Sequence, residues 1–160
     1  MSWRNELSQN IKDDIDKLYN QSLDSAVYAL SKNKRKKSGF PPYGMTLLGH
    51  GEIRIALVEY FPKSADAVDF LIKSYQEHRD EYKAVSIIFH VKLENEDKGI
   101  YIFLEHIEGA AVSIIVPYKR KGFFEKKIIL NCENSVSKAV SREVWIPLED
   151  IGDKQTKNIN

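Results

Sequence analysis

The chain has 160 residues, the length of one domain, and its 42% hydrophobic and 11% aromatic content excludes a generally disordered protein. Its 24 Lys and Arg residues nearly balance 23 Asp and Glu residues, so the formal charge of +1 excludes a polycation that binds nucleic acid or membranes through its overall charge. Cys132 is the only cysteine, which excludes an internal disulfide framework and a cysteine-rich zinc site. We expect it to be a buried, unreactive thiol in a reducing compartment.

The N-terminal sequence MSWRNELSQNIKDD lacks the apolar core of a signal peptide, and no run reaches the ~18 apolar residues of a membrane span. We therefore expect a cytoplasmic protein with no membrane contact. Residues 1–150 are predicted to form a single domain, and the polar residues 151–160 a frayed tail.

Between Asn5 and Leu30, apolar residues recur every three to five positions, which predicts an amphipathic helix. The recurring residues are Leu7, Ile11, Ile15, Leu18, Leu23, Ala26 and Leu30. The helix must end before Pro41 and Pro42, because proline has no backbone N–H with which to extend it. Residues 31–42 are therefore predicted to form a connection.

This connection is basic, with five cations among the six residues 32–37. Such a cluster can contact phosphate groups, and a solvated linker is the alternative interpretation. The candidate phosphate ligands are Lys34, Arg35, Lys36 and Lys37.

The next segments predict a hairpin and a second helix. Strands over residues 45–49 and 52–60 flank His50 and Gly51, which are typical of a tight turn. After Pro62, Ser64 is the expected N-cap of a helix that runs to about Tyr82. Its inner face would carry Ala67, Val68, Leu71, Ile72 and Tyr75.

The remaining chain alternates apolar and polar residues, which predicts strands with one buried row. Residues 84–93 form the first of these strands, an acidic turn spans 94–99, and residues 101–131 predict a three-strand meander that turns at Gly109 and Gly122. Ser141 to Ile146 is predicted to be the last strand. The buried row of the first strand would be Val85, Ile87, Phe89 and Val91.

Together these elements predict an α+β fold in the order α-β-β-α-β-β-β-β-β. Hairpin-length turns cannot make parallel crossovers, so the sheet of about seven strands is expected to be largely antiparallel. One or two helices would cover it. Because residues 100–104 and 112–116 are apolar on both faces, we expect each face to be covered by a helix or by a second subunit.

The hairpin tip at residues 118–124 interleaves aromatic and basic side chains, the combination with which proteins stack bases beside phosphate contacts. The candidate binding residues are Tyr118, Lys119, Arg120, Lys121 and Phe123. In the alternative interpretation, Tyr118 and one phenylalanine are core residues at strand ends and the cations are exposed turn residues.

Glu105 and His106 place a carboxylate beside an imidazole, the groups of general acid and base catalysis. Adjacent strand residues face opposite ways, however, so the two cannot share one site without a bulge. His50, His78 and His90 show no metal-ligand spacing. We therefore assign no catalytic residue, no metal site and no cofactor.

Four short motifs follow one another within residues 5–120: Pro42-Tyr43-Gly44, Gly51-Glu52, Leu104-Glu105-His106 and Pro117-Tyr118-Lys119-Arg120. With the helices and hairpin around them, these motifs resemble an uncharacterised group of small bacterial cytosolic proteins. The chain departs from that group at Tyr43, where the group has phenylalanine, and by its lysine run. The resemblance implies a bacterial cytosolic α+β domain and transfers no activity or site.

These observations favour a non-enzymatic binding or interaction module that self-associates and binds a protein partner, similar to immunity or adaptor proteins only by analogy. The first alternative is a nucleic-acid-binding protein that uses residues 118–124 with residues 32–37. The second is a small enzyme that uses Glu105 or His106.

Overall fold

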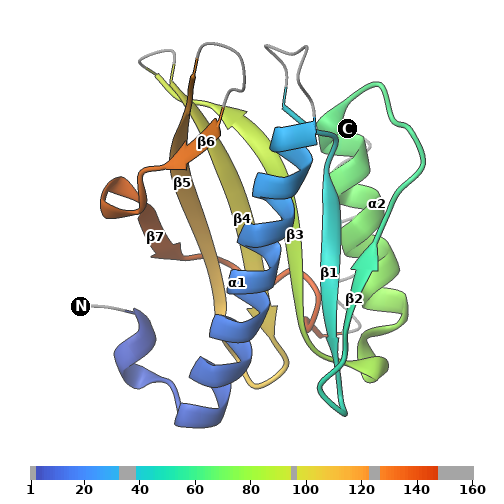
Figure 1. The fold of residues 1–160 in the computed structure, drawn as a ribbon. Coiled ribbons are helices and arrows are strands. Elements are labelled where there is room, and N and C mark those ends of the chain that lie inside the picture. Colours follow the sequence, from blue (N-terminus) through green and yellow to red (C-terminus); the bar gives the residue numbers. More distant parts are fainter. Residues whose placement is uncertain (1–2, 33–38, 95–96, 123–126, 148–160) are drawn as a thin grey trace.

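The computed structural model describes residues 3–32, 39–94, 97–122 and 127–147, which form two α-helices and a seven-stranded antiparallel sheet (Figure 1). The elements run in the order η1 (Trp3–Glu6), α1 (Gln9–Lys32), β1 (Tyr43–Leu48), β2 (Ile53–Ala56), α2 (Ser64–Glu77), η2 (Arg79–Glu81), β3 (Tyr82–Lys92), β4 (Lys98–His106), β5 (Ala111–Lys121), β6 (Lys127–Leu130), η3 (Cys132–Asn134) and β7 (Val136–Ala139). The α+β class and the order of helices and strands are confirmed.

The strands are arranged in the order β2-β1-β3-β4-β5-β6, and β7 also pairs with β5. The long strand β5 therefore has two neighbours on its outer side. Residues 118–121 of β5 pair with β6, and residues 112–115 pair with β7. At the other end of the sheet, β2 is the edge strand.

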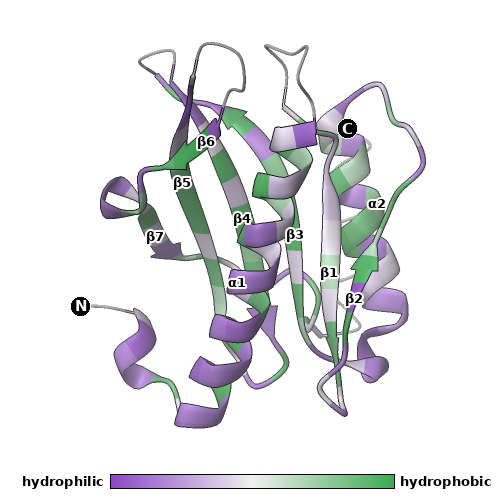
Figure 2. Ribbon diagram, in the orientation of Figure 1, coloured by the Kyte–Doolittle hydropathy of each residue, from purple (hydrophilic) through white to green (hydrophobic). Residues whose placement is uncertain are grey.

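Helix α1 crosses one face of the sheet (Figure 1). Its apolar stripe buries Leu18, Ala26 and Leu30 against the even-numbered row of the central strands, which includes Ile88 and Ile102. The outer surface of α1 is hydrophilic (Figure 2). The predicted amphipathic helix is confirmed, although it begins at Gln9 because residues 3–6 form a separate 3-10 turn.

Helix α2 and a C-terminal segment cover the opposite face. Leu71 and Tyr75 of α2 pack with Val85 and Ile87 of β3, and the same cluster includes Val144. The strands are therefore apolar on both faces because each face has its own cover within the chain. This arrangement confirms the helix-covered sheet and does not require a second subunit to cover either face.

Strand β3, which corresponds to the strand predicted over residues 84–93, buries side chains on both faces only along residues 84–88. Val85 and Ile87 are buried as expected, whereas Phe89 and Val91 are only half-buried. On the opposite side, Ser86 and Ile88 are also buried, because α1 covers that face.

The last predicted strand is wrong. Residues 141–147 pair with no strand, and β7 instead spans Val136–Ala139. Alternation of side chains is necessary for a strand but does not supply a ladder partner. The backbone N–H groups of this segment have a different acceptor, which is described below.

Three other boundaries differ from the prediction. Strand β2 ends at Ala56 rather than Tyr60. Lys63 occupies the N-cap of α2 without a side-chain hydrogen bond, and Ser64 is the first helical residue. The helix ends at Glu77, since a 3-10 turn follows and Tyr82 already belongs to β3. Among the described residues, no helix is long and apolar enough to cross a membrane.

Tyr75 anchors α2 to the centre of the sheet. Its side chain is 1% exposed, and its hydroxyl donates a hydrogen bond to the carbonyl oxygen of Ser86 at 2.9 Å. Burial raises the pKa of this phenol well above its ordinary value. Gly44 lies beneath the ring, and a Cβ at this position would be 1.8 Å from the Tyr75 hydroxyl oxygen. The absence of a side chain at Gly44 lets Tyr75 reach the β3 backbone.

The substitution Gly44→Ala should therefore lower the free energy of unfolding by about 1 to 3 kcal/mol, the usual cost of forcing an extra methyl group into a packed site. Urea unfolding measures this change. Gly49→Ala is the matched control, because a Cβ there meets no atom within 4 Å. Equal stability of the two variants would contradict the role of Gly44.

Candidate functional site

Tyr118, the aromatic residue at the start of the predicted basic tip, belongs to the core. It is 3% exposed, and its hydroxyl oxygen lies 2.7 Å from Nε2 of His90. The two rings meet edge to face with their centroids 5.7 Å apart. The structure thus places Tyr118 as the core alternative describes, with its ring faces unavailable for stacking on a base.

The cations of the tip lie on different faces of β5. Lys119 and Lys121 are exposed on one face. On the other, Nη1 of Arg120 donates a hydrogen bond to the carbonyl oxygen of Leu30 at 3.0 Å and so caps the last turn of α1. The remaining predicted ligands, Phe123, Lys34, Arg35, Lys36 and Lys37, lie outside the described residues. Nucleic-acid binding at this tip stays a prediction.

His90 lies among these groups at the end of the α1 face. Burial lowers the pKa of its imidazole, and the nearby charges of Lys98 and Arg120 lower it further. The neutral ring is therefore favoured, which suits its hydrogen bond with Tyr118. These contacts describe a half-buried structural histidine.

Glu105 and His106 point to opposite faces of β4, as predicted. The Glu105 side chain is fully buried, and its carboxylate accepts three backbone hydrogen bonds. The N–H groups of Glu143 and Val144 donate to Oε1 at 2.7 and 2.9 Å, and that of Trp145 donates to Oε2 at 2.7 Å. Nε of Arg142 lies 3.4 Å from Oε2. The carboxylate binds the C-terminal segment and not a ligand.

On the other face, the His106 side chain is 3% exposed and occupied at both nitrogens. The backbone N–H of Glu108 donates to Nδ1 at 3.1 Å, so Nδ1 carries no proton. Nε2 therefore carries the proton and donates to the Asp14 carboxylate at 2.8 Å. This pairing links β4 to α1. Neither Glu105 nor His106 is placed to exchange a proton with a substrate.

We call residues 140–147 the strap. Glu105 of β4 binds the backbone N–H groups of the strap, and side chains near α2 bind its carbonyl oxygens. Nε2 of Gln76 donates to the Glu143 carbonyl oxygen at 2.7 Å, and Nη1 of Arg79 donates to the Ile146 carbonyl oxygen at 2.7 Å. The strap thus bridges α2 and β4 without being a strand.

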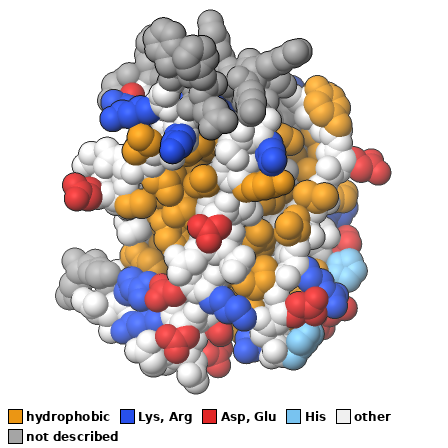
Figure 3. All heavy atoms as spheres, viewed as in Figure 1, with side chains coloured by type: hydrophobic (Ala, Val, Ile, Leu, Met, Phe, Trp, Pro, Cys, Tyr) orange, Lys and Arg blue, Asp and Glu red, His pale blue; other side chains and the backbone are white. Residues whose placement is uncertain are grey.

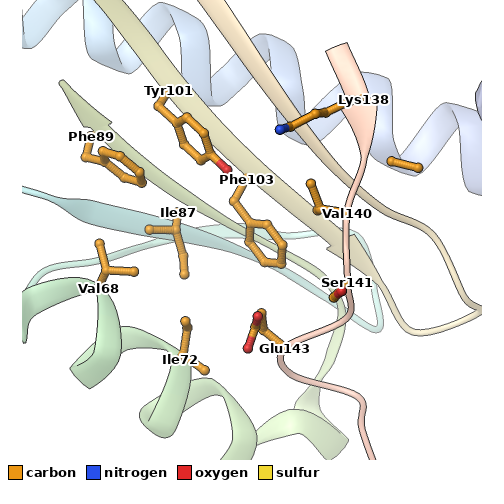
Figure 4. Close-up of a pocket in the computed structure, with 11 residues that line it drawn as sticks. Val68, Ile72, Ile87, Phe89, Tyr101, Phe103, Lys138, Val140, Ser141 and Glu143 are labelled. Atoms are coloured by element: carbon orange, nitrogen blue, oxygen red, sulfur yellow. The ribbon is translucent and has the colours of Figure 1, made fainter. Parts of the chain in front are cut away.

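An open groove lies between α2 on one side and β7 with the strap on the other (Figure 4), with a volume of about 500 Å³. Its floor is formed by Ile87, Phe89, Tyr101 and Phe103, one wall by Val68 and Ile72, and the other wall by Lys138, Ala139, Val140, Ser141 and Glu143. We call this the strap groove.

The floor of the strap groove carries a stacked aromatic pair. Phe89 and Tyr101 lie directly opposite each other on β3 and β4, with ring centroids 4.4 Å apart and planes inclined by 21°. Both side chains are only half-buried, so they offer apolar area to a ligand. Polar groups lie at the wall, where the Lys138 amino group extends toward the Tyr101 hydroxyl (Figure 4).

Sequence reasoning missed this groove. The alternation of residues 84–93 predicts Phe89 in a buried row, and the meander pattern gives Tyr101 no functional role. The only sign of the groove in the sequence is that two aromatic residues occur on two separate predicted strands. The β3–β4 register that brings them together depends on a turn whose length the alternation does not fix.

Two other sequence expectations concern isolated residues. Cys132 is exposed, which corrects the expectation of a buried thiol. It begins the surface turn η3, where no core element covers it. In the described part of the chain, no group of three or more His, Cys, Asp or Glu side chains could hold a metal ion.

Comparisons of the chain with models of protein families, with curated proteins and with solved structures found no match. The resemblance to a group of small bacterial proteins therefore stays a prediction, and the site is interpreted from its geometry.

The variant Glu105→Gln should lower the free energy of unfolding by about 2 to 4 kcal/mol. In glutamine an NH2 group replaces one of the two acceptor oxygens, so a donor faces backbone N–H groups. Hydrogen exchange of the Glu143, Val144 and Trp145 amides should accelerate more than exchange in α1. The control Glu108→Gln changes an exposed side chain on the same hairpin and should leave stability within about 0.5 kcal/mol. Unchanged protection of the strap in Glu105→Gln would refute this role.

Proposed function

We propose that this chain is a non-enzymatic binding module that holds an apolar segment of a protein partner in the strap groove. The observation that carries the proposal is the half-buried Phe89–Tyr101 pair on the groove floor. Aromatic side chains supply much of the energy of protein interfaces, and here they sit between walls that hydrogen bonds hold in place.

The shape of the groove favours a protein segment over a small molecule. Lys138, Ala139 and Ser141 line one wall and are themselves exposed, so the groove is open along that side. Small-molecule sites usually bury roughly 70 to 90% of their ligand, which an open groove does not achieve. A protein segment can place one apolar residue on the floor and make further contacts outside.

The positive charge of Lys138 at the groove wall favours protein segments that carry an acidic residue. Lys138 extends its amino group over the floor beside Tyr101 (Figure 4). An acidic residue next to the apolar anchor of the partner would lie near this cation. We therefore expect the bound segment to combine an aromatic or large aliphatic residue with a neighbouring Asp or Glu.

The contacts of Glu105 and His106, the two candidates for proton transfer, favour a binding function over catalysis. Glu105 is committed to the strap and His106 to Asp14 and the Glu108 backbone. Neither side chain lines the strap groove. The groove itself is lined by apolar side chains, with Lys138, Ser141 and Glu143 as the polar groups of its wall.

Peptides selected from a random library on the wild-type chain should bind in the strap groove. The variant Val68→Glu puts a charge on the groove wall and should weaken these peptides at least about tenfold, which titration calorimetry measures. Ser141→Trp fills the groove from an exposed position and should have the same effect.

Ile129→Glu is the matched control, because Ile129 is 44% exposed on β6 and does not line the strap groove. It should leave peptide affinity unchanged. Thermal unfolding checks that all three variants are folded. If the selected peptides bind Val68→Glu and Ser141→Trp as tightly as the wild type, or if no peptide is selected, the proposal fails.

A further inference from the structure

A second apolar surface lies at the β2 edge of the sheet, away from the strap groove. It consists of Ile55, the exposed apolar residue of β2, and Leu57, which follows the end of the strand, and the two are 60 and 78% exposed. In Figure 3, apolar side chains come to the surface over the β1–β2 side of the molecule. We call this set the β2 edge surface.

The backbone of β2 is open at the same place. In the described part of the chain, β2 pairs with β1 alone. The Leu48 N–H bonds the Glu52 carbonyl oxygen at 2.8 Å, which points the Glu52 backbone toward β1. Because this direction alternates along an antiparallel strand, Arg54 and Ala56 also face β1, while Ile53 and Ile55 point their N–H and C=O groups outward. Ile55 thus presents both an exposed apolar side chain and unpaired backbone groups.

The charged side chains of β2 do little to prevent another strand from pairing with this edge. Sheet edges are usually blunted by lysine, proline or inward-pointing charges. On β2 the one charged side chain is Arg54, which lies 3.3 Å from Glu52 and is paired within its own hairpin. An open edge of this kind is a template for another strand.

We infer that β2 pairs with β2 of a second copy of this chain, antiparallel about a two-fold axis that passes beside Ile55. In such a pair, residues directly opposite each other share a face, so Ile55 would lie opposite Ile55 of the second copy. The exposed apolar side chain of each strand would then meet the same side chain of its partner. The two-fold axis also places Arg54 of each copy opposite Ala56 of the other.

The chemistry of the edge supports an identical strand in this register. Arg54 would face the small Ala56 of the second copy, so no charge faces a like charge, whereas centring the pair on Arg54 would oppose two guanidinium groups. The outward N–H and C=O groups of Ile55 would exchange two hydrogen bonds with those of Ile55 in the second copy.

The contact is independent of the strap groove. The groove lies between α2 and β7, and its lining includes neither residue of the β2 edge surface. Each copy of the dimer would therefore keep its groove open. Failure of the peptide experiment above leaves this inference untouched.

Sedimentation velocity over a concentration series tests the association. We expect the wild type to form a dimer, and Ile55→Lys to raise its dissociation constant at least about tenfold. Ile55 is 60% exposed, so the substitution should leave the fold intact. Val136→Lys is the matched control, because Val136 is an equally exposed apolar residue, at 61%, on β7. This control should dimerise like the wild type.

Disulfide trapping tests the register. In a Cys132→Ser background, which removes the exposed native thiol, Ile55→Cys should cross-link two copies under a copper–phenanthroline oxidant. Two cysteines in the hydrogen-bonded pair at the axis would have their Cα atoms about 5.5 Å apart, within the range of disulfides. Arg54→Cys in the same background should cross-link far less. A monomer at every concentration, a dimer that Val136→Lys disrupts and Ile55→Lys does not, or cross-linking at position 54 in preference to 55 would overturn the inference. The first of these outcomes would leave the edge for a strand of a different protein.

Discussion

The fold depends on one buried carboxylate. Glu105 accepts the backbone N–H groups of Glu143, Val144 and Trp145, which are separated from it by about forty residues of chain. A buried charge is tolerable only when hydrogen bonds replace its hydration, and three N–H donors with a nearby guanidinium provide that replacement. The carboxylate also provides a hydrogen-bond acceptor for backbone N–H groups that have no neighbouring strand to pair with. The strap, the wall of the groove and the cover over part of the sheet all follow from this contact.

The two covers of the sheet are of different kinds. Helix α1 lies across one face and is fixed at its two ends, through Asp14 to His106 and through the Leu30 carbonyl to Arg120. The other face is covered by two separate pieces, α2 and the strap, which Gln76 and Arg79 tie together. A single helix leaves no opening along its length, whereas two pieces leave one between them. The strap groove is that opening, and this explains why the Phe89–Tyr101 pair is half-buried although it lies over the centre of the sheet.

The sequence predicts those parts of the molecule that depend on local periodicity. The stripe that includes Leu18, Ala26 and Leu30 predicts α1, and alternating residues with turn glycines predict β3, β4 and β5. The strap could not be predicted, because SREVWI alternates as a strand does and its hydrogen-bond acceptor is a side chain on a distant strand. The strap groove was missed for a related reason, since the position of Tyr101 opposite Phe89 is a property of register. The basic tip was visible in the sequence, but the opposite directions of Tyr118 and Lys119 divide it between the core and the solvent.

The two ends of the sheet are treated differently. At one end, β5 is closed along its length by two short strands, and each carries a lysine, Lys127 on β6 and Lys138 on β7. Short strands with lysine resist pairing with further chains. At the other end, β2 has no lysine, its arginine is paired with Glu52, and Ile55 is exposed. A sheet that needed protection from association would be expected to protect both ends. The asymmetry therefore favours a molecule that closes one edge by itself and uses the other for pairing, while the groove near the closed edge stays open to a different partner.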